Sequence, residues 1–309
     1  MKIFEGISSF QKINNPILTL GMFDGVHLGH QALIGRLNEI AQSCDGESVL
    51  LTFDPHPRTV LGNDSSDLQL ITTLSEKILL LEKAGLQNLI LQPFTKAFSE
   101  LCSTDFVKEL LVDEICMHTI VIGYDHHFGK NREGDFEQLL DLSKKYHFEV
   151  NELSEIKSDK AQISSTKIRE ALWNGELSFA NQALGRNYDL TGQVVHGDKL
   201  GRTLGFPTAN LKLEPYKLIP ANGVYVVKVQ FENQTFKGLL SIGTRPTVTN
   251  SNEKRVEVYI LDFDGNVYDK NLTVELLHFI RPDMKFNSLD ELVYQMNLDK
   301  EFAINYDLN

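Results

Sequence analysis

The sequence predicts a two-domain α/β protein, in which a helix-covered parallel sheet precedes a compact antiparallel barrel or sandwich. The chain has 309 residues, which suits two domains of about 100 to 200 residues each. β-rich and amphipathic helical runs alternate in the first half, whereas β-rich runs separated by turn residues dominate the end of the chain. We place the boundary so that the domains are 1–185 and 186–309.

The first half alternates between expected strands and expected helices. In the helix expected over 31–42, apolar residues recur at helical spacing and form one core-facing stripe of Leu33, Ile34, Leu37, Ile40 and Ala41. We expect strands at 16–23, 48–54, 88–94, 119–125 and 148–153, and further helices at 75–85, 104–115 and 135–146. Such a parallel sheet should have helices on its faces.

The second half begins with one or two helices over 164–185 and then becomes β-rich. We expect strands at 188–195, 223–231, 235–243, 255–263 and 272–280. The stretch "DGN" predicts an Asp-Gly hairpin turn, because "LDFDGNVYD" lacks the ligands of a calcium-binding EF-hand loop. A helix over 288–304 closes the chain, with Leu289, Leu292, Val293 and Met296 on one face.

The composition limits the classes of partner and the cellular location. The net charge of −12 argues against a nucleic acid or an anionic membrane as partner, because such binding needs Lys and Arg to neutralise phosphates. No apolar run approaches the roughly 18 residues that span a bilayer, and the N-terminus has no apolar signal core. Cys44, Cys102 and Cys116 form no CxxC motif. We expect a cytoplasmic protein with buried free thiols.

The first chemical motif is "LGMFDGVHLGH", residues 20–30, between an expected strand and an expected helix. Open α/β sheets bind ligands at the carboxyl ends of their strands, and the free N–H groups of the following helix suit phosphate. Gly21, Gly25 and Gly29 allow close approach of the backbone, while His27 and His30 can point the same way. The motif is neither a P-loop nor a dinucleotide fingerprint.

Three interpretations of the two histidines remain open from the loop alone. They could clamp a phosphate, cap the helix, or bind a metal ion. The metal site needs a third ligand, for which His56, His126 or His127 is the candidate.

A second motif, "ISSTKIRE" at 163–170, favours the phosphate clamp. Ser164, Ser165 and Thr166 carry helix-capping hydroxyls that could also contact phosphate, and Arg169 adds a fixed positive charge. Plain helix capping is the alternative for this motif taken alone.

A third motif, "GDKLGRTLGFPTANL" at 197–211, combines a Gly-rich loop with a stiff continuation. Its glycines permit close approach to phosphate, and Lys199 and Arg202 supply charge. If "PTANL" enters a strand, Thr208 and Asn210 share a face and offer neutral oxygens that suit Mg²⁺ beside phosphate. The alternative is a turn begun by Pro207, in which Thr and Asn bond their own backbone.

Over its whole length the sequence resembles the bifunctional riboflavin kinase/FAD synthetases of bacteria. The motifs, in the family's order, are "GMFDGVHLGH", "TFDPHPR", "GYDHHFGK", "ISSTKIREAL", "GDKLGRTLGFPTANL", "NGVYVV", "SIGTRPTV", "VEVYILDF" and "RPDMKF". The resemblance implies a Rossmann-like nucleotidylyltransferase domain followed by a riboflavin kinase-like barrel and a terminal helix.

For residues 1–185 the resemblance implies transfer of AMP from ATP to FMN, which yields FAD and pyrophosphate. His27 and His30 would donate hydrogen bonds to the ATP phosphates and stabilise charge at the α-phosphate. FMN's phosphate is already ionised at neutral pH, so this step needs no strong protein base. The implied ATP and phosphate contacts are Gly21, Phe23, Asp24, Gly25, Gly29, Ser164, Ser165, Thr166 and Arg169.

For residues 186–309 the resemblance implies phosphorylation of riboflavin to FMN by ATP. Glu257 would accept the proton of the 5′-hydroxyl, and Thr208 and Asn210 would hold Mg²⁺. Periodicity does not decide the orientation of Glu257, because both faces of its strand contain apolar residues. The implied ATP contacts are Gly197, Lys199, Gly201, Arg202, Gly205 and Pro207.

The sequence departs from the family's pattern in "GYDHHFGK". The family usually carries an aromatic residue where His126 stands, and we assign no catalytic role to His126 or His127. Polar residues at the position of Asp125 contact substrate in relatives, and for Asp125 both possibilities stay open. Two rival functions remain open. One is a nucleotidylyltransferase for another phosphate or a class I synthetase fragment, although a KMSKS-like loop is lacking. The other is a flavin-binding protein that has lost catalysis.

Overall fold

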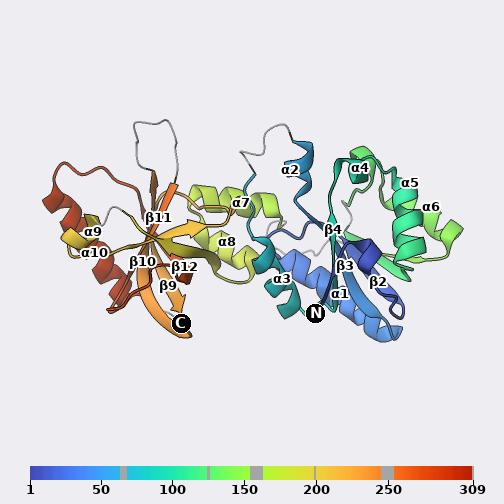
Figure 1. The fold of residues 1–309 in the computed structure, drawn as a ribbon, viewed down its shortest axis with the longest axis horizontal. Helices are drawn as coiled ribbons and strands as arrows, with labels where there is room; N and C mark the ends of the chain where they lie inside the picture. The colour runs from blue at the N-terminus through green and yellow to red at the C-terminus, as the bar shows by residue number, and fades with distance from the viewer. Residues whose placement is uncertain (63–67, 124–125, 154–162, 198–199, 245–253, 308–309) are drawn as a thin grey trace. The chain divides into compact units, whose positions relative to one another are not determined.

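The protein divides into two compact units. The computed structural model describes residues 1–62, 68–123, 126–153, 163–197, 200–244 and 254–307. The first unit comprises Met1–Leu68 and Leu74–Ile163, and the second comprises Gln69–Thr73 and Ser164–Asn309 (Figure 1). A short segment of the N-terminal half therefore belongs to the C-terminal unit. There the Leu70 N–H donates to the Tyr216 carbonyl at 2.7 Å, and the buried Lys217 donates to the Ile71 carbonyl at 3.0 Å.

The first unit is built on a six-stranded sheet in which every pairing is parallel. The strand order is β1-β4-β3-β2-β5-β6. The strands are β1 (Lys2–Glu5), β2 (Pro16–Leu20), β3 (Glu47–Asp54), β4 (Asn88–Pro93), β5 (Thr119–Gly123) and β6 (Glu149–Leu153) (Figure 1). The parallel sheet is thus confirmed. The short edge strand β1 was not expected, since only one of its four residues, Phe4, is buried. The expected burial of the free thiols is wrong, because Cys44 and Cys102 are half-buried and Cys116 is exposed.

Helices cover both faces of this sheet. On one face α1 (Leu28–Ser43) and α3 (Leu74–Lys83) bury Ile34 and Leu81 against Leu50 and Leu89 of the sheet. On the other face η2 (Phe106–Glu114) and α6 (Phe136–Tyr146) enclose a larger cluster. The predicted helix over 104–115 differs in kind, since α5 (Ser103–Asp105) continues into η2, a wider π-helix. Shorter helical segments are η1 (Ile7–Ser9), α2 (Pro57–Leu61), α4 (Lys96–Ser99) and η3 (Lys130–Arg132).

The second unit contains a closed antiparallel barrel with the strand order β10-β11-β8-β7-β12-β9, which confirms a barrel rather than a sandwich. Its strands are β7 (Tyr188–Val195), β8 (Ala209–Leu213), β9 (Gly223–Phe231), β10 (Gln234–Thr244), β11 (Lys254–Ile260) and β12 (Asn271–Pro282). Its helices are α7 (Ser165–Asn174), α8 (Leu177–Leu184), α9 (Leu200–Thr203) and the terminal α10 (Leu289–Asn305) (Figure 1). In the described part of the chain, no helix is long and apolar enough to cross a bilayer.

One predicted turn of the barrel unit is wrong, and one predicted helix face holds except at its first residue. β11 pairs with β10 and β8, whereas β12 pairs with β7 and β9, so "DGN" does not form a hairpin turn. The chain instead passes from β11 to β12 across the barrel. On α10, Leu292, Val293 and Met296 are half-buried on the face that continues to the buried Asp299 and Ala303, as predicted. Leu289, which was predicted to share this face, is 66% exposed at the start of the helix.

Candidate active sites

The "LGMFDGVHLGH" loop connects the carboxyl end of β2 to α1, and β2 lies between β3 and β5 in the sheet. Strand order reverses there, which is where open α/β sheets bind ligands. The loop backbone is unusual, because Phe23 (φ 49°) and Val26 (φ 39°) lie in the left-handed region together with Gly25 (φ 83°). Surrounding hydrogen bonds must maintain this conformation, and one joins the Gln31 amide to the Val26 carbonyl at 2.9 Å.

His27 and His30 form a stacked pair at the start of α1. Their ring centroids are 3.7 Å apart, and Phe23 stacks on the far side of His30 at 4.5 Å. His27 is the N-cap of α1, and its Nδ1 accepts from the His30 N–H at 3.4 Å. A neutral imidazole that accepts at Nδ1 carries its proton at Nε2. Helix capping by His27 is therefore real, and it leaves the Nε2–H as the ring's donor.

His30 carries an unsatisfied polar atom. Its Nδ1 is buried and has no hydrogen-bond partner among the described residues. Burial, and then the charges of His27 and Lys77, hold the pKa of His30 well below its ordinary value. Buried polar groups are normally paired. A ligand oxygen or water at this point would satisfy the ring.

The structure does not support a metal site at these histidines. In the described part of the chain, no three His, Cys, Asp or Glu side chains come close enough together to hold a metal ion. His56 instead caps α2, with its Nδ1 accepting from the Arg58 N–H at 3.1 Å. The phosphate clamp and the helix cap remain, and they are compatible with each other.

The "ISSTKIRE" segment begins α7 in the second unit. Ser164 is the N-cap, and its Oγ accepts from the Lys167 N–H at 3.3 Å. Ser165 and Thr166 follow in the first turn, and Arg169 Nε donates to the Gln69 carbonyl at 3.1 Å. Ser164 thus caps the helix, which was one of its two predicted roles, and Arg169 contacts the segment 69–73.

The second site lies on the outer surface of the barrel, where Glu257 of β11 stands opposite Asn210 of β8. The alternate residues Val256, Val258 and Ala209 are buried, whereas Glu257 and Asn210 are half-buried on the opposite face. Thr208 Oγ1 donates to Glu257 Oε2 at 3.1 Å. The expectation that Thr208 and Asn210 share a face is thus met, and the strand register supplies the Glu257 orientation that periodicity left open.

Glycines of the "GDKLGRTLGF" loop lie directly against this group. A Cβ on Gly197 would overlap the Asn210 carboxamide, and one on Gly201 would overlap the Phe206 carbonyl and lie 3.4 Å from Thr208 Oγ1. Gly205 adopts φ 82°, and Pro207 is exposed just before β8. Gly197 and Gly201 thus make close contacts with residues of the site, and their predicted close approach to phosphate stays a prediction. Lys199 and the side chain of Arg202 lie outside the described residues.

Two neighbours of this site were not singled out from the sequence. Tyr259 follows Glu257 on the same face of β11 and contacts Phe206 edge to face at 5.4 Å. Lys300 Nζ of α10 lies 5.8 Å from the Tyr259 ring centroid, so the terminal helix lies beside Tyr259. Because Tyr259 is aromatic and lies at i+2 from Glu257, strand alternation could have indicated it.

The terminal helix is joined to the barrel by a buried ion pair. Arg281 Nη2 lies 2.7 Å from Asp299 Oδ2, and Arg281 Nε donates to both carboxylate oxygens at 3.1 Å. Gln295 also donates to Asp299, at 3.0 Å. This network sets the position of α10 beside Tyr259.

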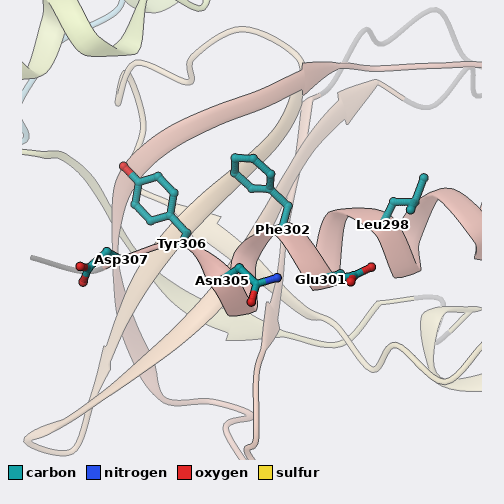
Figure 2. Close-up of a pocket in the computed structure, with 6 residues that line it drawn as sticks. All are labelled: Leu298, Glu301, Phe302, Asn305, Tyr306 and Asp307. Atoms are coloured by element: carbon teal, nitrogen blue, oxygen red, sulfur yellow. The ribbon is translucent and has the colours of Figure 1, made fainter.

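A separate groove of about 480 Å³ lies on the last turns of α10 and contains none of the predicted site residues. Figure 2 shows the rings of Phe302 and Tyr306 on the same side of the helix. His278 of β12 stacks on Phe302 at 5.5 Å.

The "GYDHHFGK" segment begins at the end of β5. The His126 N–H donates to the Gly123 carbonyl at 3.2 Å, just after β5. Asp125 lies outside the described residues.

Comparisons with known proteins agree over the whole chain. The family model for FAD synthetase matches residues 10–167, and that for riboflavin kinase matches residues 184–306. A bifunctional riboflavin kinase/FMN adenylyltransferase of Listeria monocytogenes is 40% identical, with 93% of this chain and 91% of the relative covered. The Escherichia coli K12 protein of the same description is 35% identical, with 97% and 96% covered. A crystal structure from Streptococcus pneumoniae, described as a macrolide-efflux protein, is 33% identical, has a TM-score of 0.89, and covers 99% of both chains.

Proposed function

Because the chain belongs to the family of bifunctional riboflavin kinase/FMN adenylyltransferases, we propose that it makes FAD from riboflavin in two ATP-dependent steps. The barrel unit phosphorylates riboflavin to FMN. The parallel-sheet unit then joins AMP from a second ATP to FMN and releases pyrophosphate. The observation that carries the proposal is the Thr208–Glu257 hydrogen bond, on the barrel face that also presents Asn210.

In the first step Glu257 acts as the base. One carboxylate oxygen, Oε2, is occupied by the Thr208 hydroxyl, so Oε1 is left to accept the proton of the riboflavin 5′-hydroxyl. The 5′ oxygen then bonds to the γ-phosphorus, and the bond from that phosphorus to the bridging oxygen of ADP breaks. Charge develops mainly on phosphate oxygens in such a transfer, so positioning matters more than covalent chemistry.

The donors at this site fit Mg²⁺. Thr208 and Asn210 offer neutral side-chain oxygens, and Mg²⁺ takes oxygen ligands while keeping several waters and phosphate oxygens. Since the Thr208 hydroxyl donates a hydrogen bond to Glu257, its lone pairs remain available to a cation. The glycine at 197 leaves the Asn210 carboxamide uncovered by a side chain. When bound, the ion would neutralise charge on the ATP phosphates.

In the second step the phosphate of FMN attacks the α-phosphorus of ATP. The oxygen–phosphorus bond to pyrophosphate breaks as this bond forms, and no covalent enzyme intermediate is required. His27 and His30 supply N–H donors to the charge that develops there. Two features support these roles: the Nδ1 acceptor that places a proton on His27 Nε2, and the unpaired Nδ1 of His30. The Gly21–Gly29 loop and the Ser164–Arg169 segment would add phosphate contacts.

We assign the adenylyltransferase to residues 1–185 and the kinase to 186–309 as a functional division. It differs from the division into compact units, because α7 carries the phosphate motif of the first activity yet packs in the second unit. The expected location of both reactions is the cytoplasm. The description of the pneumococcal structure as a macrolide-efflux protein applies to that protein. The two sites described here are suited to phosphate chemistry, so we propose no transport.

The direct test is a product assay. Purified protein is incubated with riboflavin, ATP and Mg²⁺, and FMN and FAD are followed by chromatography. We expect FMN to form and to be converted to FAD, with Mg²⁺ required. If neither flavin nucleotide appears, the proposal is wrong, and if FAD forms only from added FMN, the kinase assignment fails.

A further inference from the structure

A buried lysine contacts the backbone of the "LGMFDGVHLGH" loop and has no part in the mechanism above. Lys77 lies on α3, is 7% exposed, and shares its helix face with the buried Leu81. Lysine is rarely buried, because removing its charge from water is costly unless partners compensate. Its Nζ donates to the Met22 carbonyl at 3.1 Å. That position calls for an explanation.

The Met22 carbonyl is a point at which the loop conformation is held. It accepts from Lys77 and, at 3.4 Å, from the hydroxyl of the fully buried Thr52. The next residue, Phe23, has φ 49°, which a side-chain-bearing residue adopts only when its surroundings maintain it. Phe23 stacks on His30, and His30 stacks on His27. One hydrogen bond thus connects Lys77 to the packing that orients both imidazoles.

The charge of Lys77 also acts on this loop. Burial lowers the pKa of Lys77, and Asp24 and Asp54 oppose that change by favouring the ammonium form. Lys77 in turn contributes, after burial and His27, to the low pKa of His30. The charges that act on Lys77 therefore come from the loop and from the end of β3, whereas those that act on His30 come from His27 and from Lys77 of α3.

We propose that Lys77 is a positioning residue for adenylyl transfer, which holds Phe23 and the stacked His27–His30 pair in place through the Met22 carbonyl. This inference rests on the proposed function of the first unit. It requires that loss of the Lys77 hydrogen bond weaken FAD formation and leave FMN formation on the barrel unit unchanged. It also requires that His30 respond to loss of the nearby charge.

Three variants of α3 separate these effects in the full-length protein. Lys77→Met removes both charge and donor, and Lys77→Gln keeps a donor for the Met22 carbonyl without the charge. Lys83→Met is the matched control, because Lys83 is exposed on the same helix. Each variant is assayed separately for riboflavin phosphorylation and for FAD formation from FMN. The titration of His30 is followed by NMR of histidine-labelled protein, assigned with His30→Gln.

We expect Lys77→Met to lower kcat for FAD formation by about tenfold or more, with FMN formation within about twofold of the unchanged protein. Lys77→Gln should retain more FAD formation than Lys77→Met. Both substitutions should raise the pKa of His30. The control Lys83→Met should change neither the rate of FAD formation nor the pKa of His30. Unchanged FAD formation in Lys77→Met, or an unchanged His30 pKa in Lys77→Gln, would overturn the proposal. If the Met variant fails to fold, the Gln variant decides through the His30 titration. If the unchanged protein makes no FAD, the proposed function fails, and the titration still tests the link between Lys77 and His30.

Discussion

Thr208 and Glu257 are joined by a 3.1 Å hydrogen bond, although one lies just before β8 and the other on β11. Pairing of Asn210 with Glu257 in the barrel register brings the two segments together. The hydroxyl donates, so it both orients the carboxylate and keeps its lone pairs for a cation. The barrel thus places the proposed base and the proposed metal ligands on one face, and single substitutions can separate their roles.

Glu257→Gln should abolish FMN formation and leave conversion of FMN to FAD intact. The amide keeps the shape of the side chain but cannot take the proton of the attacking hydroxyl, and a general base contributes about 100-fold or more. Formation of FMN from riboflavin and of FAD from FMN is measured separately by chromatography. Glu232→Gln, in the exposed β9–β10 turn, is the control. Equal loss of both activities in a folded Glu257→Gln variant would contradict independent sites.

Thr208→Val should raise the Mg²⁺ concentration needed for half-maximal FMN formation. The substitution keeps the side-chain shape but removes one proposed oxygen ligand and the hydrogen bond to Glu257. Thr208→Ser keeps both and should resemble the unchanged protein. The measurement is FMN formation as a function of Mg²⁺ at fixed ATP. If the Mg²⁺ dependence of Thr208→Val matches that of Thr208→Ser, the metal-ligand role is wrong.

His30→Ala should stall the two-step reaction at FMN. Removing one preorganised donor to a developing oxyanion costs about 100-fold to 1,000-fold in rate. With riboflavin and ATP as substrates, FMN should therefore accumulate while FAD stays low. Glu39→Ala, at an exposed position further along α1, should still make FAD. An FAD yield from His30→Ala close to that of Glu39→Ala would exclude a role for this imidazole.

The stability of the first unit should fall on mild acidification because of His30. Its folded-state pKa lies well below the ordinary value of about 6.5, so between these two values the unfolded chain binds more protons than the folded one. Stability is therefore unaffected by this group above about pH 7 and decreases below about 6.5, by at most about 1.4 kcal/mol per pH unit. Urea unfolding followed by circular dichroism at pH 7.5 and 5.5 measures this. The acid-induced change should be smaller in His30→Asn, and an identical change would contradict the assignment.

Much of the fold could be predicted from the sequence because patterning reports burial directly. The apolar stripe of α1 and the alternating runs of the first half correspond to packed elements. Local sequence did not reveal which strands pair, so the β11–β12 connection was mistaken for a hairpin. The two-residue turn between β9 and β10 could be predicted locally, because the residues "ENQ" at 232–234 are typical of a turn, and in the structure Glu232 and Asn233 both adopt positive φ.

The candidate sites could be predicted only where a motif contains residue types that are typical of one kind of chemistry. The imidazoles and the Thr208–Asn210 pair lie within such motifs. The orientation of Glu257 depends on strand register, which is a long-range property. Lys77 was missed because a lysine within an amphipathic helix is normally solvated. Its i,i+4 spacing from Leu81 was the available signal, and its partner is a backbone carbonyl 55 positions away in the chain.

Arg281→Met should destabilise the barrel unit strongly, and the double variant Arg281→Met/Asp299→Leu should recover much of the loss. Asp299 is buried, so removal of Arg281 leaves a buried carboxylate without a counter-charge, which retains the hydrogen bond from Gln295. The expected cost is about 3 to 5 kcal/mol of unfolding free energy. Replacing both charges by apolar groups removes that cost, since buried ion pairs often contribute little net stability.

The single tryptophan of the chain, Trp173, lies in the second unit, so urea unfolding followed by its fluorescence reports on this unit. Kinase activity gives the second measurement. If the ion pair positions α10 beside Tyr259, the double variant should be stable yet bind riboflavin with a raised KM. A double variant as unstable as Arg281→Met would show that its packing, rather than the unpaired charge, determines the loss.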